Sequence, residues 1–387
     1  MPHLVSELCK ENCSVKINTG RIEFIDSLRC IAVLSVVFYH FYCRFCPPIS
    51  PINYLPFQSK PFFLLNYGYY GVQLFFVISG FVIFHTLTSS DSFSMFIKKR
   101  LIRLLPALVL CSVITFVVQQ FVPHSLDIFR SASYCDFLPG ITFTPPQIWN
   151  FLLSRNDISY IDFVYWSLFV EMVFYLVGGF IFFLRPEKFA VNWISLTFVS
   201  MGIRILTSPR LHSFFPRAVN TFFDQVYGAY TLLHLSYWIY FALGIFFYQL
   251  YSRKELPSLK MIAVILTMVC IEFYFLVKIV LILYLTVIIA LFLIFVYKPK
   301  WLNFLNQRVF LWIGFISYPL YLMHQNIGLI LINKLATWID VLPINKYIPL
   351  FVLVILCLVG HIISTYFETP VSKFLRPRLM HWKKNNS

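Results

Sequence analysis

Charged residues are scarce in this 387-residue sequence. Only 12% of the residues are Asp, Glu, Lys or Arg, whereas a soluble globular protein usually has about 25%. Hydrophobic residues make up 59% of the chain and aromatic residues 19%. A chain with so few charged groups cannot form an ordinary water-facing surface. The composition therefore excludes a soluble globular protein and favours a membrane protein built from apolar helices.

Acidic residues are the rarer charged type, since 16 Asp and Glu stand against 31 Lys and Arg, for a net charge of +15. Such an excess can indicate nucleic-acid binding, but here the basic residues cluster in short loops between apolar stretches, as topology determinants do. We therefore expect no nucleic-acid partner. The polar residues 1–24 contain no apolar signal-peptide core, so we expect the first apolar stretch to act as an uncleaved signal anchor.

The sequence also lacks a pattern of metal ligands. Its nine cysteines are scattered, and Cys43 and Cys46 alone have a CxxC spacing of interest. No second pair or nearby histidine completes a zinc set, so we expect no metal. A disulfide between Cys43 and Cys46 is left open, because it depends on their facing an oxidising compartment.

Apolar stretches of about 20 residues, the length that crosses a bilayer, recur along the chain. They predict an all-α polytopic bundle of about ten transmembrane helices. The heavier basic clusters fall on the side of the two termini, which places both termini in the cytoplasm. We expect a cytoplasmic tail (1–24), a transmembrane domain (25–368) with an extracytoplasmic loop (about 123–162), and a basic cytoplasmic tail (369–387). The expected spans are about 25–46, 68–88, 104–122, 163–184, 189–207, 226–250, 259–276, 279–297, 309–332 and 347–367.

Two ionisable residues lie within the first span, Arg29 and His40. Eleven residues of α-helix correspond to about three turns, so the two side chains share one face about 16 Å apart along the axis. Ionisable groups are costly in a bilayer and usually mark a functional site. The alternative is that Arg29 reaches the lipid headgroups and His40 is an interfacial histidine.

Two further arginines, Arg100 and Arg103, precede the third span together with Lys98 and Lys99. A spacing of three residues lets both guanidinium groups project from one face of a helix. Their planar donors suit phosphate groups, so we interpret the pair as a phosphate-binding site. The alternative is that all four residues only determine topology.

The fourth span carries Ser167, Glu171 and Tyr175 at i, i+4 and i+8, which forms one polar stripe. A carboxylate near the middle of a membrane needs a partner, and Arg29 or His40 could serve. The alternative is a structural ion pair that ties the first and fourth spans together.

The ninth span presents Ser317, Tyr321 and His324 on one face. In the second span, the small residues Gly71, Ser79 and Gly80 are most simply packing positions between helices.

Taken together, these stretches resemble the acyltransferase 3 family. The first motif is D-x-L-R, with a histidine eleven positions after its arginine. The motifs that carry the resemblance lie at Asp26, Arg29 and His40; at Gly71 to Phe81 (G-V-x-L-F-F-V-x-S-G-F); at Phe96, Arg100, Arg103 and Pro106; at Trp166, Ser167, Glu171, Phe174 and Tyr175; at Ile316 to His324 (I-S-Y-x-L-Y-L-x-H); and at Glu368 and Pro370. Gln73 departs from the family, which often has an aspartate there.

This resemblance implies a multi-pass enzyme of the bacterial inner membrane. It would be an O-acyltransferase that moves an acyl group, usually acetyl, from cytoplasmic acyl-CoA to a hydroxyl of an extracytoplasmic glycan such as O-antigen or exopolysaccharide. Its partners would be membrane lipid and a glycan or glycolipid acceptor. The expected catalytic residues are His40, Arg29 and Glu171, and the expected acyl-CoA ligands are Arg100, Arg103 and Arg29. The expected substrate-binding or supporting residues are Asp26, Ser79, Trp166, Ser167, Tyr175, Tyr321 and His324.

Two other functions compete with acyl transfer. A proton-coupled transporter or flippase would use His40, Glu171 and Arg29 as a proton relay, but it would not need the two arginines before the third span. A non-catalytic membrane scaffold would not depend on His40. The acceptor, the acyl group and the oligomeric state are left open by the sequence.

Overall fold

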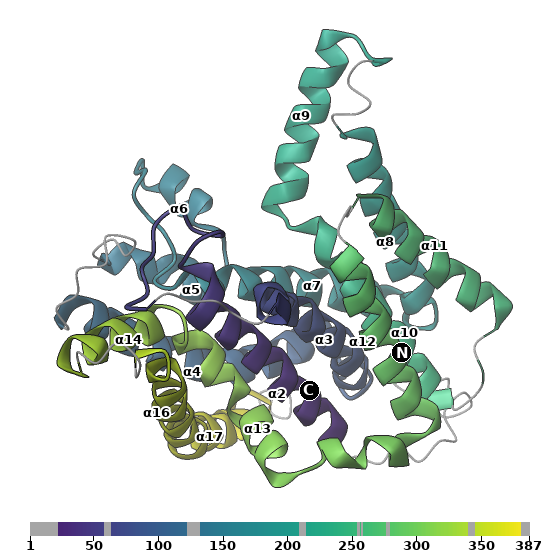
Figure 1. Cartoon of the computed structure of the whole chain (residues 1–387). Helices are drawn as coiled ribbons and strands as arrows, with labels where there is room; N and C mark the ends of the chain where they lie inside the picture. Colours follow the sequence, from purple (N-terminus) through teal and green to yellow (C-terminus); the bar gives the residue numbers. More distant parts are fainter. Residues whose placement is uncertain are drawn as a thin grey trace. The chain divides into compact units, whose positions relative to one another are not determined.

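The computed structural model describes residues 22–57, 63–121, 132–208, 214–253, 256, 258–275, 279–339 and 345–380. Throughout this part of the chain the regular elements are helices (Figure 1), which confirms the all-α prediction. The expected tails, apart from residues 22–24 and 369–380, and residues 123–131 of the expected loop lie outside the described residues. The α-helices are α2 (Glu23–Tyr39), α3 (Gly71–Thr88), α4 (Phe93–Phe121), α5 (Phe137–Thr142), α6 (Pro146–Leu152), α7 (Trp166–Leu184), α8 (Phe189–Leu206), α9 (Arg217–Leu232), α10 (Trp238–Arg253), α11 (Leu259–Phe275), α12 (Ile279–Tyr297), α13 (Arg308–Met323), α14 (Asn326–Ile339), α16 (Ile348–Ile362) and α17 (Thr369–Met380).

The described residues contain six helices that are long and apolar enough to cross a membrane, or nine if each sharply bent pair forms one span. This confirms a polytopic helical bundle. Two of the expected spans are bent. The span expected at 226–250 bends by 62° between α9 and α10, and the span expected at 309–332 bends by 80° between α13 and α14. Hydropathy does not show such bends, because both arms of each pair are apolar.

The helix α4 begins well before the span expected at 104–122, so Arg100 and Arg103 lie inside it. Pro106 also lies within α4 and has no N–H to donate to the carbonyl of Ile102 four residues earlier. The Ser372 hydroxyl, on α17, donates to this carbonyl at 3.0 Å. A residue of the expected C-terminal tail therefore completes the hydrogen bonding of α4.

The chain divides into two compact units. The first unit contains the chain up to Ile25, Gln73–Ile97 and Val173–Asn306. The second contains Asp26–Val72, Lys98–Met172 and the chain from Gln307 onward. Each unit is described below by itself.

In the first unit, two glycines let α3 and α10 pack backbone against backbone. A side chain at Gly80 would collide with the Phe241 carbonyl, and one at Gly244 would collide with the Val77 carbonyl. Small residues make such close helix crossings within membranes possible. A second link in this unit is the ion pair between Arg204 of α8 and Glu272 of α11, at 2.9 Å.

In the second unit, glycines hold two segments against α2 in the same way. A side chain at Gly71 would collide with the Ala32 carbonyl, and one at Gly314 would collide with the Asp26 carbonyl. The first turns of α13 therefore lie directly on the beginning of α2. Because both helices continue from this contact, their polar residues can meet further along.

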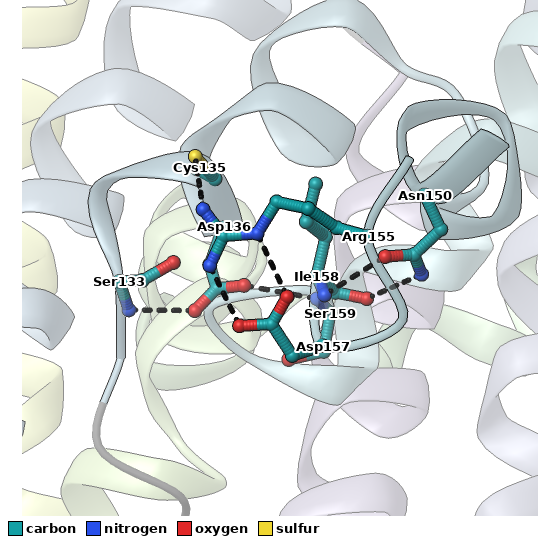
Figure 2. Close-up of polar contacts among 8 residues, drawn as sticks. All are labelled: Ser133, Cys135, Asp136, Asn150, Arg155, Asp157, Ile158 and Ser159. Atoms are coloured by element: carbon teal, nitrogen blue, oxygen red, sulfur yellow. Dashed lines mark hydrogen bonds and ion pairs between the residues drawn. The ribbon is translucent and has the colours of Figure 1, made fainter. Parts of the chain in front are cut away.

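The described part of the expected extracytoplasmic loop, residues 132–162, has a defined shape (Figure 2). The Asp136 side chain accepts hydrogen bonds from the backbone N–H groups of Ser133 at 2.7 Å and Ser159 at 2.9 Å. The Asn150 side chain donates to the Ile158 carbonyl and accepts from the Ile158 N–H, both at 3.0 Å. These bonds fix the segment that leads into Asp162 and α7.

Candidate functional site

His40 lies where the first membrane helix changes its geometry. The backbone is α-helical through Tyr39 and continues as a π-helical turn over His40–Arg44. Such turns are rare and often occur at functional sites. The imidazole Nδ1 of His40 lies 2.9 Å from the Val36 carbonyl oxygen. A carbonyl only accepts hydrogen bonds, so this contact places a proton on Nδ1.

His324 is the second imidazole of the site. Its Nε2 lies 3.2 Å from Nδ1 of His40, and the two rings meet at 75° with their centroids 4.8 Å apart. Its own Nδ1 donates to the Tyr321 carbonyl at 2.7 Å, so Nε2 of the neutral ring is an acceptor. His324 is completely buried. In this arrangement Nδ1 of His40 donates toward both Val36 and His324, and Nε2 of His40 carries the lone pair that can take up a proton.

The chain bends directly after His324, between α13 and α14. A helix start leaves backbone N–H groups without partners inside the helix. The N–H of Asn326 donates instead to the Asp162 carboxyl group at 3.0 Å, and the Asn326 side chain donates to the Ile161 carbonyl at 2.9 Å. The Gln325 amide donates to the Asn326 side chain at 3.2 Å. The bend is thus built from polar side chains.

Asp162 is completely buried at the end of the loop. Its second carboxyl oxygen accepts from the Val164 N–H at 3.2 Å. Burial raises the pKa of the Asp162 carboxyl group to about 7, although the hydrogen bonds from Asn326 and Val164 act in the opposite direction.

The polar faces expected on the fourth and ninth spans meet at Ser167 and Tyr321, whose hydroxyl groups lie 2.9 Å apart. Both also donate toward the Val164 carbonyl, at 3.0 Å from Ser167 and 3.2 Å from Tyr321. We refer to this connected set as the imidazole cluster. It consists of His40, Asp162, Ser167, Tyr321, His324, Gln325 and Asn326.

A second set of ionisable groups lies near the other end of α2. Arg29 donates to the Asp26 carboxylate at 2.9 Å, and their side chains are 19% and 6% exposed. The charges of Arg103 and Arg29 both act on Glu368, whose carboxylate accepts from the Ser364 hydroxyl at 3.4 Å. We call Asp26, Arg29, Arg100, Arg103 and Glu368 the arginine cluster. Because α2 is continuous between Arg29 and Tyr39, Arg29 and His40 lie about 16 Å apart along its axis.

The two arginines of α4 have different surroundings. Arg100 is 5% exposed, whereas Arg103 is exposed. The Arg103 side chain therefore reaches the surface of the protein, while the Arg100 side chain lies within it.

For Glu171 of α7, the expected partner is Arg29 or His40, and this pairing stays a prediction. The charge of Glu171 and that of Glu368 both act on Tyr318, whose hydroxyl donates to the Leu104 carbonyl at 3.0 Å. Among the described residues, the hydrogen-bond partners of His40 are the Val36 carbonyl and His324. The group that orients His40 is thus His324.

The other expected site residues are distributed as follows. Trp166 is half-buried and begins α7. Ser79 on α3 and Tyr175 on α7 belong to the first unit. The Tyr175 ring there meets Phe96 edge-on with centroids 6.1 Å apart. Cys43 and Cys46 are both buried thiols, and no disulfide joins them in the structure.

Asp162, Gln325 and Asn326 do not stand out as site residues in the sequence. A weak signal existed for each. Asp162 directly precedes an apolar span, where a residue can cap the start of a helix. Gln325 and Asn326 are two consecutive amides within an apolar stretch, immediately after His324.

Comparison with known proteins now identifies the family. A model of the acyltransferase domain matches residues 22–367, nearly the whole chain. The chain belongs to the acyltransferase 3 family. This confirms the resemblance inferred from the motifs.

A curated relative is nodulation protein 10 from Rhizobium leguminosarum bv. viciae. It is 26% identical over 171 residues, which cover 41% of this chain and 44% of the relative. The chain thus aligns with less than half of that protein's length. No solved structure matches the chain.

Proposed function

We propose that this protein is a membrane-bound O-acyltransferase. It moves an acyl group, acetyl in the simplest case, from acyl-CoA to a hydroxyl of an extracytoplasmic glycan such as O-antigen or exopolysaccharide. The observation that supports this best is the contact of His40 with the buried His324, about three helical turns along α2 from an arginine cluster. Family membership supports the same reaction class.

The arginine cluster suits the donor. Guanidinium groups bind phosphate with planar, charge-assisted hydrogen bonds, and exposed Arg103 can receive the phosphates of CoA. Arg29 lies between this position and His40 along the path of α2. An extended pantetheine arm then carries the thioester toward His40, so the nucleotide need not cross the membrane.

His40 suits the general base. Its Nε2 takes the proton of the acceptor hydroxyl while the hydroxyl oxygen attacks the thioester carbonyl. The C–S bond breaks, the acyl group stays on the acceptor oxygen, and the thiolate of CoA takes the proton back from His40. Throughout, Nδ1 keeps its bonds to Val36 and His324, which stabilise the transient imidazolium. In a variant of this route, Nε2 itself carries the acyl group between donor and acceptor.

The sidedness follows from the distribution of basic residues. With both termini in the cytoplasm, the arginine cluster faces the cytoplasmic acyl-CoA pool and the 132–162 loop faces outward. We place the protein in the inner membrane of a bacterial cell on this basis.

Purified protein in liposomes, supplied with acetyl-CoA labelled in the acetyl group and an acceptor glycan, tests this proposal. The wild-type protein should transfer the label, and His40→Ala should lower the rate by at least about 100-fold, the usual contribution of a general base. The transfer rate of the control His85→Ala, on α3, should stay within about twofold of the wild-type rate. Absence of transfer by the wild-type protein, or normal transfer by His40→Ala, would contradict the proposal and favour the transporter.

A further inference from the structure

One carboxyl group serves the beginnings of two helical segments. Asp162 accepts from the Val164 N–H, which begins the turn that leads into α7, and from the Asn326 N–H, the first residue of α14. The side chain has no solvent exposure. Unpaired N–H groups at a buried helix start are costly, so the position of each segment depends on this carboxyl group.

The second of these segments begins directly after the partner of His40, His324. Asn326 lies two residues after His324, across the bend. The Asn326 N–H and side chain both bond to residues 161–162, and Gln325 bonds to Asn326. The backbone from His324 to Asn326 is therefore fixed from the side of the loop. The 3.2 Å contact between the two imidazoles is made at the beginning of this same segment.

We infer that Asp162 is a positioning residue for acyl transfer, which holds the bend between α13 and α14 so that His324 keeps Nδ1 of His40 engaged. The inference rests on the proposed function. Without the Asp162–Asn326 bond, the bend shifts and Nδ1 of His40 loses the contact with His324 that, together with the Val36 carbonyl, orients the imidazole. A displacement of about 1 Å in a catalytic constellation costs about 100-fold in rate.

The loop offers a matched control in Asp136. This carboxyl group is also buried, at 1% exposure, and also accepts from two backbone N–H groups. Its partners Ser133 and Ser159 both belong to the loop (Figure 2). Asp162→Asn and Asp136→Asn make the same chemical change, in which one carboxyl oxygen becomes an NH₂ group that cannot accept from a backbone N–H.

The measurement is the acetyl-transfer rate of the full-length variants in liposomes as a function of acetyl-CoA concentration. Asp162→Asn should lower kcat by about 10- to 100-fold while KM for acetyl-CoA stays within about twofold. Asp136→Asn should leave kcat within about threefold. A purely structural role for Asp162 predicts that Asp162→Asn and Asp136→Asn lower kcat equally. That result would overturn the inference. Normal kcat in Asp162→Asn would overturn it as well.

A second pair of variants tests the same bond from its donor side. Asn326→Pro removes the N–H that donates to Asp162, and proline is well tolerated at the first position of a helix. Asn326→Ala keeps the N–H and removes only the side chain. The kcat of Asn326→Pro should fall at least about tenfold below that of Asn326→Ala, and equal values would contradict the inference. Lack of transfer by the wild-type protein would instead contradict the proposed function itself.

Discussion

The hydrogen bonds of a single imidazole decide what His40 can do. Both acceptors near Nδ1, the Val36 carbonyl and Nε2 of His324, favour a proton on that atom. Nε2 is then the nitrogen with the lone pair that can accept a proton. His324 therefore accepts the hydrogen bond from Nδ1 of His40 and orients its ring, a role that a carboxylate has in many other sites. Unlike a carboxylate, the neutral imidazole of His324 brings no charge into the membrane.

The arginines of α4 give a prediction about the donor. Arg100→Ala combined with Arg103→Ala should raise KM for acetyl-CoA at least about tenfold, because each charge-assisted hydrogen bond to phosphate contributes about 1.5–3 kcal/mol. The control is Lys98→Ala with Lys99→Ala, which removes the same charge from the same helix. The KM of this control for acetyl-CoA should stay within about threefold of the wild-type value. An unchanged KM in the arginine variant would place the CoA phosphates elsewhere.

The positions of some site residues could be predicted from the sequence, and those of others could not. Arg29 and His40 could be placed on one face because they share a helix whose period is fixed. Ser167 and Tyr321 could be placed on polar faces in the same way, although not against each other. Asp162 and Gln325 could not, since their roles depend on where the chain bends and on which loop meets the bend.

Among the helices, α4 and α17 are joined by one hydrogen bond that has a clear cause. Pro106 leaves the Ile102 carbonyl without its partner in the helix, and the Ser372 hydroxyl replaces that partner at 3.0 Å. Within membranes, such replacements keep a proline compatible with a helix.

A double-mutant cycle measures this link. Ser372→Ala should lower the free energy of unfolding by about 0.5–1.5 kcal/mol, the net value of a typical hydrogen bond. In the Pro106→Ala background, residue 106 regains an N–H that bonds the Ile102 carbonyl. Ser372→Ala should then leave the free energy of unfolding almost unchanged. Thermal unfolding in detergent would report both values. Equal costs in the two backgrounds would show that Ser372 acts through another contact.

The bend between α13 and α14 divides the ninth expected span into two helices. Its two arms are both apolar, so hydropathy merges them into one helix. The polar residues at the break, His324 to Asn326, find partners from α2 and the loop, which lie far away in the sequence. Irregular backbone at membrane depth is tolerated only where other parts of the protein satisfy it.

For the molecule as a whole, the class of fold could be predicted because long apolar stretches in a chain with 12% charged residues leave few alternatives. The two compact units could not, because each is assembled from segments that are interleaved along the sequence. The arginine and imidazole clusters belong to the second unit, at opposite ends of α2. One helix thus carries a residue for each substrate of the proposed reaction.

The most direct measurement of the central claim is the acyl content of the surface glycan. NMR or mass spectrometry should compare cells that lack the gene with the same cells carrying the wild-type gene, His40→Ala or His85→Ala. We expect O-acyl groups on the glycan with the wild-type and His85→Ala proteins, and none with His40→Ala at equal protein levels in the membrane. Full O-acylation with His40→Ala, or identical glycans with and without the gene, would contradict the account.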